Sequence, residues 1–222
     1  LHHQPDGAPY ANPAELSLRC LAAAETAGIA ITLLPTLYNH GGFGGQPAIA
    51  GQRRFVNDAN RYLKIQETLR GAVTGHPLRR LGLSPHSLRA VTAELLNEVL
   101  AGIDTVAPVH IHVAEQTKEV DDCLAWCGKR PVDLMLDSFD VTSRWTAIHA
   151  THMTEAETRR LAQSGCIGEV GRRVRIAAER AAGELAVEEA QRAAGCDCRL
   201  AVDGLCDPCG VREALGGGRR RC

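Results

Sequence analysis

The stretch PVHIHVAEQTKEV, residues 108–120, decides how this chain is expected to fold. Apolar residues alternate with imidazoles in its first half, and successive side chains of a β-strand point to opposite faces. One face of the expected strand is therefore apolar and the other carries imidazoles: Val109, Ile111 and Val113 against His110 and His112. Glu115 follows just beyond the strand.

Strand-like and helix-like segments alternate on both sides of this stretch. We expect helices at residues 12–28, 51–73, 92–103, 118–128 and 154–165, and strands at residues 29–39, 80–91, 108–114, 144–153 and 166–170. Strands that alternate with helices of this length form βαβ units around a parallel sheet. The sequence therefore predicts an α/β fold, either doubly wound or closed into a barrel.

Residues typical of helix ends stand where these helices should begin and stop. Asn12 can cap the first helix, with Pro13 in its first turn and Gly28 at its end. Thr92 and Thr154 occupy the N-cap positions of two later helices. These five residues predict the boundaries of three helices.

Composition is typical of a globular protein and argues against several kinds of partner. The 222 residues are 45% hydrophobic, which suffices for the core of one or two domains. A formal net charge of −1 gives no electrostatic reason to expect nucleic acid or an anionic membrane surface. The apolar runs fall short of the roughly 20 residues that span a membrane. Nine cysteines without the dense spacing of a secreted scaffold suggest reduced thiols, so we expect a cytoplasmic protein.

The composition changes near Val170. Residues 171–222 contain 10 Arg, 8 Gly and 5 Cys but no Lys, His or aromatic residue, so they offer little for a core. We expect an α/β part over 1–170 and an atypical Cys/Arg/Gly-rich tail over 171–222. A zinc knuckle, a poorly ordered segment and a shifted reading frame are all open for the tail. The knuckle would use a C-x-C-x7-C-x2-C motif: Cys196, Cys198, Cys206 and Cys209.

Ionisable side chains gather at the predicted carboxyl ends of three consecutive strands. In parallel α/β folds the loops at those ends form the ligand-accessible rim. Neutral imidazoles bind zinc well, and a carboxylate just past a strand can act on water beside the metal. The residues are His86 and Arg89, His112 and Glu115, and His149 and His152.

Each of these residues also has a structural interpretation. A single strand histidine is more often hydrogen-bonded within the protein than bound to a ligand, and His110 can lie beneath the site with His112 as the ligand. Arg89 can form a salt bridge at a helix start, or it can bind a substrate carboxylate in a bidentate manner. Glu115 alone can be a solvated charge that the helix dipole favours. Their occurrence on three successive strands favours a common site.

Five segments resemble a known family: LLPTLYNHGGFGGQP, GQRRFVND, PHSLRAVT, PVHIHVAEQTKEVDDCLAW and RWTAIHATHMT. They are similar to the formimidoylglutamate deiminases of the amidohydrolase superfamily, and the resemblance runs from about Leu1 to about Cys166. The resemblance implies a zinc-dependent (β/α)8 TIM barrel. It also implies hydrolysis of N-formimidoyl-L-glutamate to N-formyl-L-glutamate and ammonia in histidine degradation, and a homodimer in the intact family.

The resemblance assigns roles to the matching positions. His112 corresponds to a zinc ligand on the fifth barrel strand, and Glu115 to the acid/base that moves protons between water and the formimino nitrogen. His149 corresponds to the sixth-strand histidine that orients the water. His86 and Arg89 correspond to residues that hold the carboxylate-bearing glutamate part of the substrate. Tyr38 and His40 lie within the resemblance without an assigned role.

The sequence also departs from the family pattern. An H-x-H zinc pair on the first strand and an aspartate on the eighth have no counterpart, and the adjacent His2 and His3 would face opposite ways on a strand. About 250 residues make a typical barrel of this kind. We therefore expect a partial barrel, an incomplete and impaired copy that binds zinc weakly and turns over little or no substrate.

Two other functions stay open. One is another amidohydrolase deaminase with a guanine-like substrate, and the other is a non-catalytic fragment or zinc-knuckle interaction protein. Arg89 favours an acidic substrate, because a planar base offers no carboxylate to a guanidinium.

Overall fold

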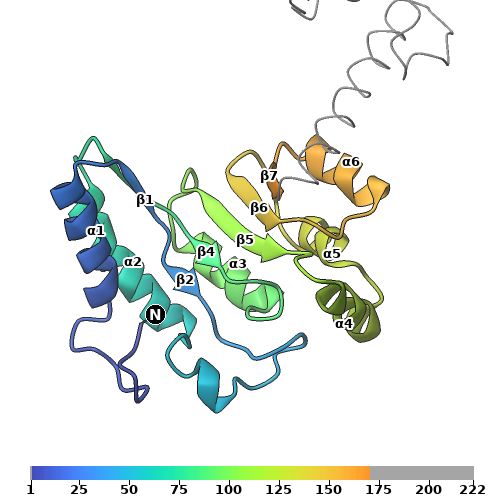
Figure 1. The fold of residues 1–222 in the computed structure, drawn as a ribbon, viewed down its shortest axis with the longest axis horizontal. Helices are drawn as coiled ribbons and strands as arrows, with labels where there is room; N and C mark the ends of the chain where they lie inside the picture. Colours follow the sequence, from blue (N-terminus) through green and yellow to red (C-terminus); the bar gives the residue numbers. More distant parts are fainter. Residues whose placement is uncertain (1, 171–222) are drawn as a thin grey trace, which may run out of the picture. The chain divides into compact units, whose positions relative to one another are not determined.

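The computed structural model describes residues 2–170, which form a mixed α/β fold (Figure 1). The tail expected at 171–222, with its four-cysteine motif, lies outside the described residues. The helices are α1 (Glu15–Ala27), η1 (Ala50–Gln52, a 3-10 turn), α2 (Ala59–Val73), α3 (Ala93–Ala101), α4 (Thr117–Cys127), α5 (Pro131–Ser138) and α6 (Glu155–Gln163). The strands are β1 (Ile31–Leu33), β2 (Thr36–Leu37), β3 (Arg79–Leu81), β4 (Ser84–Pro85), β5 (Val109–Val113), β6 (Trp145–His149) and β7 (Ile167–Val170).

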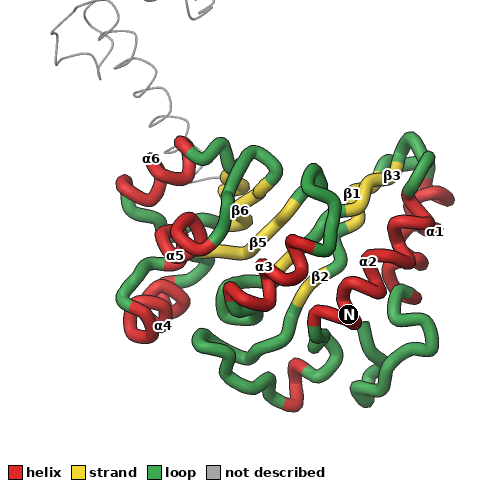
Figure 2. Tube along the Cα trace, turned by 180° about the vertical axis from the view of Figure 1, so that it is seen from behind, coloured by secondary structure: helices red, strands yellow, loops and turns green. Residues whose placement is uncertain are grey.

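Every pairing between these strands is parallel. β1 pairs with β3, β2 pairs with β4, and β5, β6 and β7 form a sheet in that order. A parallel bridge between Leu83 and Val109 joins the β3–β4 segment to β5. The β1–β2 segment therefore lies beside the β3–β4 segment, which lies beside β5, and β6 and β7 follow in order (Figures 1 and 2). The predicted parallel α/β class is confirmed.

The two faces of β5 differ as the alternation predicted. Its three apolar residues, Val109, Ile111 and Val113, are fully buried in a cluster that includes residues of α3, α4 and α5. His110 and His112 lie on the other face and are partly exposed. Helices thus cover the apolar face of this strand, and the opposite face carries the imidazoles. A smaller cluster joins α1, β1 and α2.

Gly82, between β3 and β4, lies against the residue that precedes β5. A Cβ atom added at Gly82 would be 2.5 Å from the carbonyl oxygen of Pro108 and 2.6 Å from the side chain of Leu34. The Gly82 amide donates to the carbonyl of Leu33 at 2.9 Å. The close approach of three strand segments therefore requires glycine at this position.

Several predicted helix ends are confirmed. The side chains of Thr92 and Thr154 accept hydrogen bonds from backbone amides in the first turns of α3 and α6. Gly28 ends α1 in the left-handed conformation at φ 67°, which glycine adopts without strain. Local cap chemistry therefore determined these boundaries.

Three details of the predicted helices are wrong. The helix expected over 51–73 begins only at Ala59, because Asp58 caps it; residues 53–55 form a turn and residues 56–58 have no regular secondary structure. Asn12 does not cap α1: its side chain accepts from the amide of Ala14, two residues on, and the helix begins at Glu15. No helix was expected over 131–138, where α5 begins with proline in its first turn.

None of the helices among the described residues is long and apolar enough to cross a membrane.

Candidate active site at the strand ends

A row of aromatic rings crosses the carboxyl ends of β2, β4, β5 and β6. Tyr38 lies edge-on to His86, with their ring centroids 4.9 Å apart. His86 lies 5.1 Å from His112, and His112 lies 5.5 Å from His149, again between centroids. Four neighbouring strand segments therefore each contribute one ring to the same site. The structure brings together the three histidines that the sequence placed at strand ends.

The backbone of His86 orients His112. Nδ1 of His112 lies 2.7 Å from the carbonyl oxygen of His86. Since a carbonyl oxygen only accepts, this nitrogen carries the proton, and Nε2 of neutral His112 keeps its lone pair. A metal-ligating histidine characteristically has such a fixed tautomer.

His86 is held in its neutral form. Burial is the main cause that lowers its pKa to about 4, and the nearby His112 and Arg89 contribute to this shift. Nδ1 of His86 also lies 3.1 Å from the hydroxyl of Ser87. At neutral pH the ring therefore offers hydrogen bonds without adding a charge.

Glu115 and His149 face each other across the ends of β5 and β6. Oε1 of Glu115 lies 3.7 Å from Nε2 of His149, and the two side chains are 35% and 42% exposed. A ligand can therefore reach both groups. A carboxylate and an imidazole at this separation can exchange a proton with a small molecule bound between or beside them.

The backbone leaves these two strands in an uncommon conformation. Ala114, His149 and Ala150 have φ angles of 50°, 69° and 45°. Non-glycine residues adopt this left-handed region rarely and at some cost, and such residues cluster at functional sites. The amide of Ala150 donates to the carbonyl of Val113 at 3.0 Å, which ties the two turns together. This turn geometry sets the directions in which Glu115 and His149 leave their strands.

Arg89 is the cationic group of the site. Its Nε atom is buried and has no hydrogen-bond partner, and Arg89 forms no ion pair with a residue of the described part. Its charge nevertheless acts on nearby groups: after burial and His112 it helps to lower the pKa of His86, and it partly opposes the rise that burial causes in the pKa values of Tyr38 and Glu119. The structure therefore does not show the helix-start salt bridge that was the alternative for Arg89.

Sequence reasoning assigned no role to Tyr38, whose ring extends the row. Its hydroxyl accepts a hydrogen bond of 2.7 Å from Gln52, and burial raises its pKa. The signal was available, because Tyr38 directly follows a strand, as His86 does. The backbones of His40 and His152 lie close to the same strand ends. The amide of His40 donates to the carbonyl of Ala90, and the amide of His152 donates to the carbonyl of Ala114.

A glycine-rich loop beside the row is held by α4. Phe43 stacks on Trp126 with centroids 5.7 Å apart and an interplanar angle of 17°. Gly44, at φ 73°, lies so close to the indole that an added Cβ atom would be 2.6 Å from its Nε1. The loop that follows Tyr38 is thus fixed to the helix that follows Glu115.

The described residues meet the needs of a bound zinc only in part. His112 suits a ligand, because Nδ1 is fixed and Nε2 keeps its lone pair. However, no three His, Cys, Asp or Glu side chains within residues 2–170 are grouped closely enough to hold a metal ion. One ligand is therefore accounted for in this part of the chain, and a complete set is not.

Comparison with known proteins supports the resemblance seen in the sequence. No family model matches the chain. Formimidoylglutamate deiminase of Pseudomonas aeruginosa is 52% identical over 169 residues, which are 75% of this chain and 37% of that enzyme. A 5-methylthioadenosine/S-adenosylhomocysteine deaminase of Lawsonia intracellularis is 33% identical over 86 residues, 38% of this chain and 20% of that protein. This chain thus spans little more than a third of the length of the deiminase from Pseudomonas aeruginosa.

Solved structures agree in fold. An amidohydrolase from Brucella melitensis has 54% identity and a TM-score of 0.73 over 76% of this chain and 37% of its own. An adenosine deaminase from Xanthomonas campestris, solved with bound zinc, has a TM-score of 0.54 at 23% identity over 66% of this chain and 31% of its own, and supports the fold alone. By sequence and by fold, this chain is therefore similar to part of formimidoylglutamate deiminase, an enzyme of the amidohydrolase superfamily.

Proposed function

We propose that the chain carries part of the active site of a zinc-dependent deiminase that hydrolyses N-formimidoyl-L-glutamate to N-formyl-L-glutamate and ammonia. The observation that carries the proposal is the contact of Glu115 with His149, 3.7 Å apart, at the end of a row that includes His86 and His112. The similarity to formimidoylglutamate deiminase supports the choice of reaction.

Each side chain has a part in this proposal. Glu115 takes a proton from the attacking water and returns it to the leaving nitrogen, and His149 orients that water. Arg89 and His86 hold the carboxylate-bearing part of the substrate. The unpaired, buried Nε atom of Arg89 supports this role, because a guanidinium is suited to bidentate binding of a carboxylate.

His112 would supply one zinc ligand through Nε2. When bound, zinc lowers the pKa of water from about 15.7 towards about 7, which makes hydrolysis possible near neutrality. Because the described residues supply no complete ligand set, we expect this chain to hold zinc weakly and to release ammonia slowly.

The parallel segments β1 to β7 would then be part of a (β/α)8 barrel of the amidohydrolase type. The side-by-side order of the segments supports this. The proposal also includes a homodimer, which the resemblance implies. Its substrate is a small molecule that bears carboxylates.

Binding of the product tests the substrate class without requiring turnover. We expect the purified chain to bind N-formyl-L-glutamate in isothermal titration calorimetry and the R89M variant to lose that binding, since Met removes the charge and keeps a long side chain. R19M, which changes an exposed arginine on α1, is the matched control. Equal binding by the wild-type chain and R89M would refute the assignment.

Ammonia release tests the reaction itself. With added zinc, E115Q should lower the release from N-formimidoyl-L-glutamate by about 10²-fold or more, as general acid–base catalysis accounts for about 10²–10⁴-fold. E155Q, on the exposed first turn of α6, should leave it unchanged. Equal rates for the wild-type chain and E115Q would contradict the role of Glu115.

A purine deaminase is the second candidate, because several similar proteins are named 5-methylthioadenosine/S-adenosylhomocysteine deaminase. 5-Methylthioadenosine and guanine present a planar base and no carboxylate, S-adenosylhomocysteine has one carboxylate far from its base, and N-formimidoyl-L-glutamate has two. Arg89 favours the acidic substrate. Ammonia release from S-adenosylhomocysteine or guanine, with none from formimidoylglutamate, would reverse this choice.

A further inference from the structure

Glu119, in the first turn of α4, is a carboxylate buried directly behind the active site. Glu119 is only 2% exposed to solvent. Oε2 accepts a hydrogen bond of 3.0 Å from the amide of Glu115, four residues earlier. The other oxygen, Oε1, is buried and has no partner. A carboxylate in this setting loses its hydration, and burial accordingly raises its pKa.

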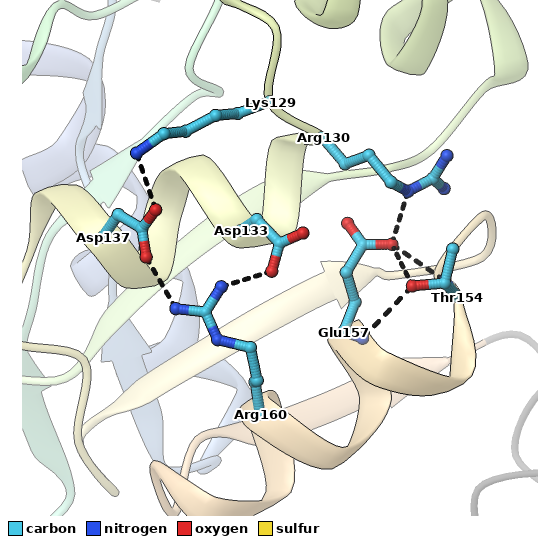
Figure 3. Close-up of polar contacts among 7 residues, drawn as sticks. All are labelled: Lys129, Arg130, Asp133, Asp137, Thr154, Glu157 and Arg160. Carbon is cyan, nitrogen blue, oxygen red and sulfur yellow. Dashed lines mark hydrogen bonds and ion pairs between the residues drawn. The ribbon is translucent and has the colours of Figure 1, made fainter.

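Glu157 shows what a buried glutamate at the same helical position looks like when its role is to stabilise the fold. It is the third residue of α6, as Glu119 is of α4, and it is fully buried. One oxygen accepts from the amide and the hydroxyl of Thr154 in a capping box, and Arg130 forms an ion pair with it at 2.6 Å (Figure 3). Glu157 therefore has both a cap and a counter-ion, and what it shares with Glu119 is a buried Oε1 without a hydrogen-bond partner.

Glu119 has neither of these supports. The N-cap of α4, Gln116, makes no side-chain capping bond. Glu119 forms no ion pair within the described part of the chain, and the charge of Arg89 acts on it without direct contact. A helix-capping role alone would not require burial of this carboxylate, since glutamates in a first turn are normally solvated.

The hydrogen bond of Glu119 holds the backbone of Glu115, the residue to which the proposed function gives the proton transfer. It holds the amide of Glu115, which follows Ala114 at φ 50°. The left-handed turn at Ala114 is the point at which the chain could relax, and the side chain of Glu115 leaves the backbone immediately after it. A fixed amide at Glu115 therefore restricts where its carboxylate lies relative to His149.

We infer that Glu119 is a positioning residue: its carboxylate fixes the backbone at Glu115 and so directs the Glu115 carboxylate at His149. This inference rests on the proposed function for the role of Glu115 in proton transfer. Glu119 itself touches neither the substrate nor the reacting atoms in this scheme.

The first measurement is the distance between the two side chains, which requires no turnover. In nuclear Overhauser spectra of the full chain, contacts between the Glu115 methylene protons and the His149 ring should be present in the wild type and in E119Q, whose amide oxygen can accept the same bond. E119A should lose them. E157A is the matched control: it should lower the free energy of unfolding and keep the contacts.

The second measurement is ammonia release from N-formimidoyl-L-glutamate. E119A should lower kcat by about 10²-fold, the order expected for a small misplacement of a catalytic group, with KM within about twofold of the wild type. E119Q should restore most of kcat. A purely structural role would instead lower the amount of active protein and leave kcat of the folded fraction unchanged.

The outcomes separate the two proposals. Folded E119A with undiminished contacts between Glu115 and His149 would overturn the inference. If E119A does not fold, E119D replaces it, because its shorter side chain keeps the charge but cannot reach the Glu115 amide; retained contacts in E119D would be equally adverse. If no variant and no wild-type chain releases ammonia, the proposed function fails, and the contacts still decide the role of Glu119.

Discussion

Gly82 shows at the scale of one residue how closely the strand segments pack. The nearest obstacle to a side chain there is the backbone oxygen of Pro108, which cannot rotate away as a side chain can. The sequence shows a glycine between two strand-like pieces, but only the coordinates show that no Cβ atom fits.

We expect G82A to destabilise the fold by about 1–3 kcal/mol, the usual cost of overpacking a core. G71A is the control, because an added Cβ atom on this α2 residue meets nothing within 4 Å; it should stabilise by about 0.5–1 kcal/mol through helix propensity. Urea denaturation measures both. An unchanged midpoint for G82A would mean that the strands can move apart without cost.

Residue types and their spacing predicted much of the candidate site. The period of two in β5 separated the imidazole face from the apolar face, and the strand-end rule grouped His86, His112 and His149. Burial could not be predicted in the same way: Glu119 has the sequence context of an ordinary solvated helix-start glutamate. Its contact with Glu115 depends on a turn at Ala114 that the sequence does not indicate.

Two kinds of ion pair connect the helices that follow β5 and β6 (Figure 3). Arg130, at the start of α5, pairs with the fully buried Glu157 of α6 and also donates to the carbonyl of His152. Arg160 pairs with Asp133 and Asp137 of α5 where all three side chains are about a third or more exposed. Arg130 therefore also fixes the loop beyond His149, whereas the ion pairs of Arg160 are exposed to solvent.

We therefore expect R130M to destabilise the fold by about 3–5 kcal/mol, because it leaves a buried carboxylate without its counter-ion. R160M should have a clearly smaller effect, since exposed pairs are screened by water and salt. Thermal or urea unfolding of the two variants compares them directly. Equal losses would show that the burial of Glu157 adds nothing to the strength of its pair.

Helix positions were predictable from cap residues, whereas links between helices were not. Thr92, Thr154 and Gly28 carry local signals that act within a few residues. The pairing of Arg130 with Glu157 joins residues far apart in the chain, so no spacing rule indicates it. The helix α5 was missed because it follows α4 after only a short connection and begins with a proline.

At the scale of the whole molecule, the parallel order of the strands followed from the alternation of strands and helices. A complete metal site could not be predicted in the same way, because the described residues contain one histidine oriented like a zinc ligand and no complete set of ligands. The match with the deiminase from Pseudomonas aeruginosa likewise covers only 37% of the length of that enzyme.

Metal removal tests this directly. Treatment with a chelator should leave the melting temperature of the C206S/C209S variant unchanged, because the described residues offer no complete zinc site; the two substitutions remove the thiols of the tail as a source of bound zinc. Differential scanning calorimetry and elemental analysis are the measurements. One tightly held zinc ion per chain in this variant would contradict the expectation.

Stability should also fall with acidity. His2 is 3% exposed, and its burial is the main cause that lowers its pKa from 6.5 to about 4, with a contribution from nearby positive charges such as Arg61. Since the unfolded chain takes up the proton first, the contribution is complete above about pH 6.5 and is lost as the pH falls towards 4. H2N should reduce this loss by roughly 2–3 kcal/mol between pH 7 and pH 4. Urea denaturation at several pH values checks it, and an identical pH profile for H2N would refute it.

The stacking of Phe43 on Trp126 has an optical consequence. The chain has two tryptophans; Trp145 is fully buried, whereas Trp126, on α4, is 51% exposed and contacts the glycine-rich loop at Phe43 and Gly44. Emission at longer wavelengths, collected from W145F, would therefore come from Trp126 alone. Such a signal would report whether a small acidic molecule changes the surroundings of the loop beside Tyr38, without a dye or label.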